Sequence, residues 1–276
     1  MAIKVYKRNT AGRRNMSVIK PEQVSRSTSE KSLTVKMNYK AGRGGGKISV
    51  RHKGGRVKRL YRQIDFRQDK IDIPGKIAEI ERDPNRSALI ALVHYADGEK
   101  RYIIATAKMA VGDTIITAPG APVEEGNRLQ LKNIPSSTTI SSVELVPGKG
   151  VQMIRSAGSG ALLMAIEDGY AQIKLPSGEI RIVNADGYAT VGQVSNFEHS
   201  AVKIGKAGRA RHMGKRPAVR GSAMNPVDHP HGGGEGKQGV GLKYPKTPWG
   251  RPALGVKTRK KNKRSNRFIL KSRHKK

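Results

Sequence analysis

The residues whose side chains are best suited to catalysis or ligand binding lie together in the C-terminal third of the chain. Residues 225–236 read Asn-Pro-Val-Asp-His-Pro-His-Gly-Gly-Gly-Glu-Gly. Their imidazoles and carboxylates could hold a metal ion, or could act as base and orienting group in a hydrolytic centre. They could also line an irregular loop in which the imidazoles donate hydrogen bonds to nucleic acid or stack on its bases.

The spacing within residues 225–236 favours the nucleic-acid loop. Metal sites usually show helical or Cys/His ligand spacing, and this segment shows neither. A hydrolytic centre needs an activated nucleophile, and no serine or cysteine suited to that role is apparent. We therefore predict no catalytic residue and no metal ligand among Asp228, His229, His231 and Glu235. An enzyme that uses His229 with Asp228 as a general base is kept as an alternative function.

Two glycine-rich stretches resemble phosphate-binding loops only in part. Residues 41–47 read Ala-Gly-Arg-Gly-Gly-Gly-Lys, but a P-loop needs glycine where Ala41 stands and Ser or Thr where Ile48 stands. Residues 234–239 match the dinucleotide fingerprint letter for letter, yet no predicted strand precedes them and no predicted helix follows. We interpret the first as a flexible basic loop whose glycines let the backbone approach phosphates, and the second as a chance match.

The charge of the chain is divided unequally along its length. Its 276 residues include 54 Lys and Arg against 21 Asp and Glu, a formal net charge of +33. Residues 1–70 carry +16, residues 71–197 carry −2 and residues 198–276 carry +19. Because Lys and Arg that neutralise phosphates release condensed counterions, such extensions are typical of segments that become ordered on nucleic acid.

Composition also excludes several classes of protein. Cysteine is absent, which rules out disulfides, cysteine-based zinc fingers and a thiol nucleophile. No apolar stretch approaches the ~20 residues of a membrane-spanning helix, and neither extension has the sustained period of an amphipathic membrane-binding helix. Residues 1–10 lack the apolar core of a secretory signal, so we expect a cytoplasmic location.

The near-neutral centre must supply the scaffold that positions the basic segments. Short β-branched runs between turn residues predict strands, and Asp97-Gly98 predicts a hairpin because Asp-Gly favours turns with positive φ. The runs are residues 76–81, 88–95, 101–106, 114–118, 151–155, 161–167, 170–175, 179–183 and 189–195. Their spacing is typical of small barrels rather than βαβ units.

These runs predict a mostly β fold in four parts. A basic N-terminal extension covers residues 1–70, one small barrel covers residues 71–125 and a second covers residues 126–197. A basic, Gly/Pro-rich C-terminal extension covers residues 198–276. The tyrosines of the centre are predicted to be barrel core rather than stacking platforms: Tyr95, Tyr102, Tyr170 and Tyr188.

Arg86 and Arg155 stand at strand ends in the sparsely basic centre. Loops at strand ends are where small barrels hold nucleic acid, and arginine makes planar, bidentate phosphate contacts that lysine cannot. We predict that both contact nucleic acid, against the alternative that they are ordinary solvated arginines.

Taken together, these features resemble the family of large-subunit ribosomal protein two, bacterial type. The resemblance rests on the basic loop of residues 42–59, the two sets of strands, residues 201–220 and residues 243–251. Its most specific part is the string Asp-His-Pro-His-Gly-Gly-Gly at residues 228–234. The resemblance implies an oligonucleotide-binding-type barrel followed by an SH3-like barrel, with long irregular basic extensions buried in ribosomal RNA.

The resemblance also implies a function. It predicts a structural constituent of the large ribosomal subunit that is a primary binder of 23S-type rRNA. It predicts support of subunit association, tRNA binding and peptide-bond formation near the peptidyl transferase centre. The implied partners are that rRNA, small-subunit rRNA at the subunit interface, other ribosomal proteins and, indirectly, tRNA, with no membrane and no cofactor. The implied location is the cytoplasmic ribosome, with an organellar ribosome as the alternative, and the alternative function is that of a non-ribosomal basic nucleic-acid-binding protein.

The expected RNA-contacting residues lie in the two extensions and at the two strand ends. In the family, the loop that matches residues 225–236 runs toward the peptidyl transferase centre, and we expect His229 to contact RNA rather than to catalyse. The full set is Arg43, Lys47, Arg51, His52, Lys53, Arg56, Lys58, Arg59, Arg86, Arg155, Lys206, Arg209, Arg211, His212, Lys215, Arg216, Arg220, Asn225, His229, His231, Lys237, Trp249 and Arg251.

Overall fold

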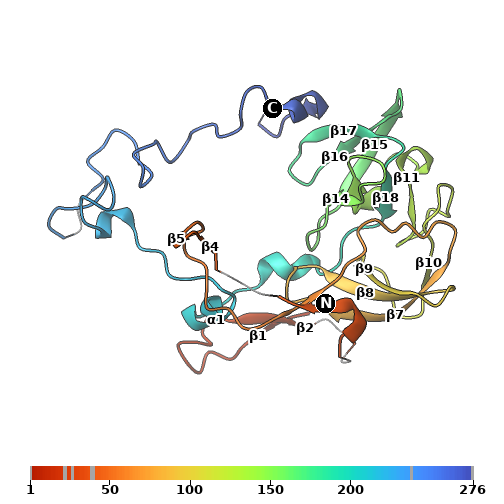
Figure 1. The fold of residues 1–276 in the computed structure, drawn as a ribbon, viewed down its shortest axis with the longest axis horizontal. Helices are drawn as coiled ribbons and strands as arrows, with labels where there is room; N and C mark the ends of the chain where they lie inside the picture. The colour runs from red at the N-terminus through yellow and green to blue at the C-terminus, as the bar shows by residue number, and fades with distance from the viewer. Residues whose placement is uncertain (1, 21–23, 26–27, 38–40, 237–238, 275–276) are drawn as a thin grey trace. The chain divides into compact units, whose positions relative to one another are not determined.

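A computed structural model of the chain describes residues 2–20, 24–25, 28–37, 41–236 and 239–274. The chain divides into two compact units. The first, which we call the body, comprises Met1–Tyr39, Lys58–Arg209 and Arg267–Lys276. The second, the basic unit, comprises Lys40–Val57 and Ala210–Asn266. Strands dominate the body, whereas the basic unit is mostly irregular chain (Figure 1), so the predicted mostly β fold is confirmed.

The first sheet of the body is antiparallel, with strand order β10-β7-β8-β9 (Figure 1). Each strand corresponds to a predicted run, although the ends differ by up to three residues. The strands are β7 (Gly75–Arg82), β8 (Leu89–Tyr95), β9 (Lys100–Ile104) and β10 (Thr114–Ile115).

Strand β8 is an almost unbroken apolar run because both of its faces are covered. Leu89, Ala91 and Val93 face one hydrophobic core. Ile90 and Leu92 face the other way and pack with a second cluster that contains the fully buried ring of Tyr102. Since successive side chains of a strand point to opposite faces, a strand buried on both sides needs apolar residues at every position.

A bulge in β7 explains how two isoleucines three residues apart reach the same core. Residues at i and i+3 of a regular strand point to opposite faces. The pairing of β7 with β8 shifts between Ile77 and Glu79, and the extra residue brings Ile77 and Ile80 into one cluster at 1% and 2% exposure.

The predicted Asp-Gly hairpin forms, but with a different turn. Only Gly98 has positive φ, at 85°, and its amide donates to the Tyr95 carbonyl at 3.0 Å. The Tyr95 amide donates to Glu99 at 3.0 Å and closes the loop. In this hairpin only the glycine has positive φ, so the loop is longer than the predicted tight Asp-Gly turn. Asp168-Gly169 is the tight turn, because the φ values of both residues are positive, at 49° and 76°.

The second sheet of the body has seven strands in the order β11-β18-β12-β15-β16-β17-β19, all antiparallel to their neighbours. Its core contains Leu129, Ile140, Leu163 and Ile173, each at 1% exposure or less. The strands are β11 (Arg128–Gln130), β12 (Thr139–Ser141), β15 (Ala161–Glu167), β16 (Tyr170–Lys174), β17 (Ile180–Asn184), β18 (Tyr188–Val191) and β19 (Ile269–Lys271). A separate hairpin joins β13 (Val143–Glu144) to β14 (Val151–Met153).

The tyrosine predictions are confirmed at two positions. Tyr95 and Tyr102 are buried, at 6% and 0% exposure. The prediction for Tyr170 is wrong: its ring is 46% exposed, because it is the first residue of β16, directly after the Asp168-Gly169 turn. Tyr188 is only partly buried and lies beside the guanidinium of Arg128.

A buried ion pair links β11 to β13. The Arg128 side chain is 1% exposed; its Nη2 donates to Oε1 of Glu144 at 3.0 Å and its Nη1 donates to the Ser142 carbonyl at 2.9 Å. Glu144, whose side chain is 3% exposed, also accepts from the Tyr188 amide at 3.3 Å. Burial lowers the pKa of Arg128 and the Glu144 charge opposes that change, so each charge depends on the other.

Parts of both predicted extensions are folded into the body. β1 (Ala2–Val5) pairs with β2 (Ser17–Lys20), and Ile19 is buried at 3% exposure. Ser17 exchanges hydrogen bonds with Lys203, whose carbonyl accepts from the Ser17 amide at 3.0 Å and whose amide donates to Oγ at 2.8 Å. β3 (Thr34–Lys36) pairs with β6 (Leu60–Arg62).

The remaining elements are short. They are β4 (Arg43–Gly44), β5 (Lys47–Ile48), the single α-helix α1 of the described residues (Ala207–His212), and 3₁₀ turns at Lys31–Leu33, Leu131–Asn133, Phe197–Ala201, Gly221–Ala223 and Arg264–Phe268. None of the described helices has the length and apolar character needed to cross a membrane.

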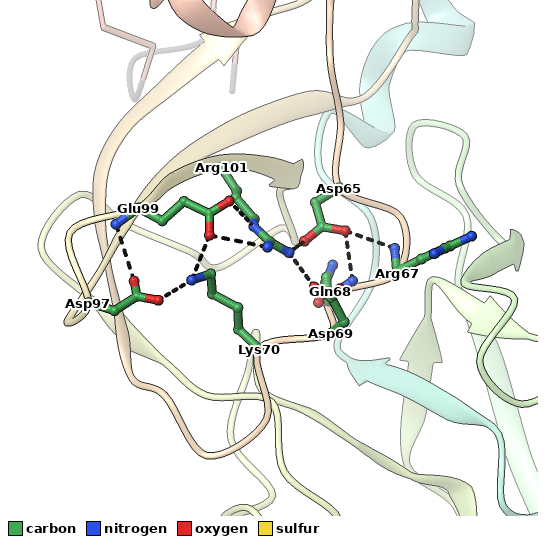
Figure 2. A network of polar contacts seen from close by, with 8 residues as sticks. All are labelled: Asp65, Arg67, Gln68, Asp69, Lys70, Asp97, Glu99 and Arg101. Carbon is green, nitrogen blue, oxygen red and sulfur yellow. Dashed lines mark hydrogen bonds and ion pairs between the residues drawn. The ribbon is translucent and has the colours of Figure 1, made fainter.

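An ion-pair network ties residues 65–70 to the β8–β9 hairpin (Figure 2). The Arg101 guanidinium contacts Asp65 at 2.6 Å, Glu99 at 2.8 Å and also Asp69. Lys70 bridges Glu99 and Asp97 from the other side. Hydrogen bonds from Arg101 and Lys70 lower the pKa of Glu99 to about 2, and the pKa values of Asp69 and Asp97 are lowered by Arg101 and Lys70 respectively.

The network predicts an acid-sensitive attachment of residues 65–70. A carboxylate whose pKa is lower in the folded chain stabilises the fold above its unfolded pKa, and that contribution is lost as pH falls through the folded value. We therefore expect the thermal unfolding temperature to fall between pH 4.5 and about 2. At pH 6 the Glu99→Gln variant should unfold at a lower temperature than the parent protein. Between pH 4.5 and about 2 its unfolding temperature should fall by less than that of the parent. Glu167→Gln, outside the network, should follow the parent protein, and equal pH slopes for all three would contradict the prediction.

Candidate nucleic-acid interface

The glycine-rich segment of the basic unit forms a tight hairpin. β4 pairs with β5, and Gly45 and Gly46 turn between them with φ of 56° and 73°. Glycine adopts these left-handed angles at no steric cost, so the glycines serve the turn. The predicted loop is therefore a hairpin, and it holds the side chains of Arg43 and Lys47 exposed on adjacent strands.

Two segments that are distant in sequence lie side by side in the basic unit. Backbone hydrogen bonds of 3.0–3.1 Å join residues 52–57 to residues 212–216, and Lys53 faces Lys215 in an antiparallel bridge. The ladder gathers six predicted residues, which are His52, Lys53, Arg56, His212, Lys215 and Arg216. Because like charges at this density repel, a polyanion that neutralises them stabilises the arrangement.

Arg211 lies beneath this ladder. Its guanidinium packs on the backbone of Gly55, where a Cβ atom would lie 3.3 Å from Nη2. Its Nη1 is buried without a hydrogen-bond partner among the described residues. Arg211 therefore supports the ladder from within, unlike its exposed neighbours.

The histidine-containing loop is folded on itself. The amides of Asp228 and His229 donate to the Asn225 carbonyl at 3.0 and 3.3 Å, and the Gly232 amide donates to the His229 carbonyl at 2.8 Å. Gly232 approaches the Asn225 carbonyl so closely that any side chain at this position would clash. The ring of His229 packs against Gly221 and is only 8% exposed, whereas the side chain of Asn225 is exposed.

Backbone donors assign the protons of both imidazoles. The His231 amide donates to Nδ1 of His229 at 3.0 Å, and the Lys246 amide donates to Nε2 of His231 at 2.7 Å. A ring nitrogen that accepts a hydrogen bond carries no proton, so neutral His229 is protonated at Nε2 and neutral His231 at Nδ1. The rings lie edge to face with centroids 4.7 Å apart. His229 is therefore arranged as a donor at Nε2.

Among residues that the structure describes, no group of three or more His, Asp or Glu side chains is placed to hold an ion. The nitrogen of each imidazole that could coordinate a metal in its neutral form already accepts a backbone hydrogen bond.

In the body, Arg86 and Arg155 meet at the ring of Phe66. Their guanidinium carbons lie 5.7 and 5.2 Å from its centroid, within the range of cation–π attraction. Arg86 also forms an ion pair with Asp83, whose side chain is completely buried, and lies 6.0 Å from the ring of Tyr61. The two predicted strand-end arginines are therefore brought to one place and held there by neighbours.

A pocket of about 330 Å³ opens beside Arg86. Its lining includes the basic side chains of Arg82, Arg86 and His199. Asn196, which also lines it, has a buried Oδ1 with no hydrogen-bond partner among the described residues. Asp83, whose carboxylate pairs with Arg86, also lines it, so the lining carries both signs of charge.

The other predicted residues are dispersed. Arg59 donates to the Pro84 carbonyl at 2.5 Å and Arg209 donates to the Ser17 carbonyl at 3.0 Å, so both hold backbone of the body in place. Lys58 and Lys206 are exposed on the body, and Arg51, Arg220, Trp249 and Arg251 are exposed on the basic unit. Lys237 lies outside the described residues.

Comparison with protein families accounts for this combination of barrels and basic segments. Residues 30–117 match the family described as Ribosomal Proteins L2, RNA binding N-terminal domain. Residues 124–250 match Ribosomal Proteins L2, C-terminal domain. The chain belongs to the ribosomal protein L2 family. It is therefore a structural, RNA-binding protein of the large ribosomal subunit, its partner is rRNA and its place is the ribosome.

Membership of the L2 family also explains the two sheets of the body. They are the oligonucleotide-binding-type barrel followed by the SH3-like barrel, which confirms the predicted fold class. The division at residues 125 and 126 stays a prediction, as do the roles of individual RNA-contacting residues.

Phe66 and Asp83 belong to the candidate interface, although the sequence did not indicate them. Phe66 is one of only three phenylalanines, but nothing in its neighbourhood marks it as the ring between two arginines. In the sequence Asp83 follows a strand and has the character of a turn residue. In the structure its carboxylate orients Arg86 and accepts a hydrogen bond from the Asn85 amide at 2.8 Å.

Proposed function

We propose that this L2-family protein is a primary binder of 23S-type rRNA that supports peptide-bond formation near the peptidyl transferase centre without catalysing it. The proposal rests above all on one observation: the cation ladder and the His229 loop belong to one compact unit. That unit has 20 Lys and Arg residues against two acidic ones. Such a unit can be held by many phosphates while it presents a folded loop to the surrounding RNA.

The hydrogen bonds of His229 support a positioning role. A general base needs a free nitrogen lone pair within reach of the proton it removes. The Nδ1 lone pair of His229 is used by the His231 amide, and Nε2 carries the proton. In this state Nε2–H of the imidazole donates a hydrogen bond to an acceptor of the RNA, either a phosphate or a base. That hydrogen bond fixes the position of the loop on the RNA.

The proposed partners follow from the family and the charge distribution. Beside 23S-type rRNA, we include small-subunit rRNA at the subunit interface, other ribosomal proteins and, indirectly, tRNA. The proposal includes all the predicted RNA-contacting residues. The residues of the ladder, together with Arg86 and Arg155, are its most important contacts. The ribosome concerned is cytoplasmic, with an organellar ribosome as the alternative.

Replacing His229 by glutamine tests the proposed role of His229. Glutamine retains a donor and an acceptor but cannot titrate. Large subunits reconstituted with His229→Gln are expected to form peptide bonds at a rate close to that of the parent, with the same pH profile. Loss of a general base would lower the rate about 10²- to 10⁴-fold and would change the profile. Single-turnover rates across the pH range distinguish the two outcomes.

The matched control is His229→Ala, which leaves the His231 amide without its acceptor. We expect this variant to reduce the yield of assembled subunits, with an unchanged pH profile in those that assemble. A pH profile altered in both variants would overturn the non-catalytic role, because a purely structural defect does not remove a titrating group.

A further inference from the structure

Trp249 lies in a hydrogen-bonded turn of the basic unit. It is the only tryptophan of the chain, and 76% of its surface is exposed. The Gly250 amide donates to Thr247 at 2.9 Å, the Thr247 amide donates to Arg251 at 2.7 Å, and Lys246 faces Pro252 in an antiparallel bridge. The turn residues suit their places, since proline favours the second turn position and Gly250 has a φ of 79°. The ring is therefore held out by a closed hairpin.

A cation covers part of this ring. The Arg51 guanidinium carbon lies 5.2 Å from the centroid of the indole. Arg51 lies three residues after β5, so a segment distant in sequence supports the tryptophan. Cation–π contact of this kind is attractive even at an exposed site. The exposed fraction of 76% leaves most of the ring surface open to a further partner.

The surroundings of the ring identify the chemistry of that partner. A large exposed aromatic side chain in a unit with 20 basic and two acidic residues is a poor site for a neutral apolar surface. It suits a polyanion that also has flat aromatic groups, which is nucleic acid. Bases inside a duplex are already stacked on their neighbours, so only an unpaired base can use the ring.

We propose that Trp249 is a stacking platform for one unpaired base of rRNA, with Arg51 completing the stack on the ring. This inference rests on the proposed function and adds a contact to the base rather than to phosphate. It also assigns different roles to residues of the same unit: Lys53 and Lys215 neutralise phosphates, whereas Trp249 makes a contact without charge.

Because Trp249 is the only tryptophan, its own fluorescence tests the proposal without a label. The full-length protein is titrated with a single-stranded oligoadenylate and, separately, with the matching RNA duplex. We expect saturable quenching with the single strand and a smaller effect with the duplex. Binding of both RNAs, followed by fluorescence anisotropy of labelled RNA, with unchanged tryptophan emission would overturn the stacking platform and leave the proposed function intact. Failure to bind either RNA would count against the proposed function itself.

Variants distinguish stacking from charge. Trp249→Leu is expected to weaken binding of the single strand about five- to 150-fold, with an unchanged salt slope, because base stacking involves no phosphate. Trp249→Phe should recover most of the loss, and Lys53→Gln should lower the salt slope. A reduced slope in Trp249→Leu would overturn the proposal. So would emission that responds to phosphatidylserine vesicles and not to RNA, because the ring would then be a membrane contact.

Discussion

Binding of the protein to large-subunit rRNA is expected to weaken about 10³- to 10⁵-fold as monovalent salt rises from about 50 to about 200 mM, if about six to ten phosphates are neutralised. The physical reason is counterion release, which adds about 0.7–0.9 to the slope of log K against log salt for each phosphate. The ladder of residues 52–57 and 212–216 places enough cations in one unit to supply much of that slope. A salt titration of the equilibrium constant with a 23S rRNA fragment measures it directly.

Charge variants show which unit produces the slope. The double variant Lys53→Gln/Lys215→Gln should lower the slope by about two, because each substitution removes about one phosphate contact. Lys132→Gln, an exposed lysine of the body that pairs with Asp186, serves as the matched control and should leave the slope unchanged. A flat titration of the parent protein, or equal slopes for both variants, would contradict the assignment of phosphate contacts to the ladder.

Replacing Glu144 by alanine is expected to remove about 3–5 kcal/mol of the free energy of unfolding. The substitution leaves the Arg128 guanidinium, at 1% exposure, without its counter-charge, and leaves the Tyr188 amide without an acceptor. Since a domain is stable by only about 5–15 kcal/mol, this loss is large. Denaturant unfolding followed by circular dichroism, with m-values compared between variants, measures it.

Two controls separate burial from charge in this test. Asp186→Ala breaks the Lys132–Asp186 pair, whose side chains are 48% and 61% exposed, and should cost under about 1 kcal/mol. The double variant Arg128→Met/Glu144→Leu replaces the pair by apolar groups and should recover most of the loss. If Glu144→Ala costs no more than Asp186→Ala, the pair does not hold β11 to β13.

The strands of the centre could be predicted because their signals are local. β7, β8, β15 and β16 are long, rich in β-branched or apolar residues, and bounded by turn residues such as Asp168-Gly169. β11, β12 and β13 have two or three residues each and were not predicted. These strands form because of their partners elsewhere in the chain. In the sequence alone, Arg128 of β11 has the character of a solvated residue, and only its contact with Glu144 explains its burial.

The same distinction applies to the interface. The string of residues 228–234 and the cations of both extensions are visible in the sequence. The pairing of residues 52–57 with 212–216 is not, because neither segment has a strand signal and their contact joins distant positions. The proton positions of His229 and His231 also depend on backbone amides, which no residue pattern reveals.

The basic unit is joined to the body by four passages of the chain. Each of its two segments, Lys40–Val57 and Ala210–Asn266, is continuous at both ends with chain that belongs to the body. After the second segment, β19 pairs with β17. The unit is therefore a pair of closed loops rather than a free tail. A closed loop cannot pass end-first through an opening in already folded RNA. If rRNA surrounds these loops in the subunit, it has to fold around them, and the connectivity of the chain then restricts the order of folding.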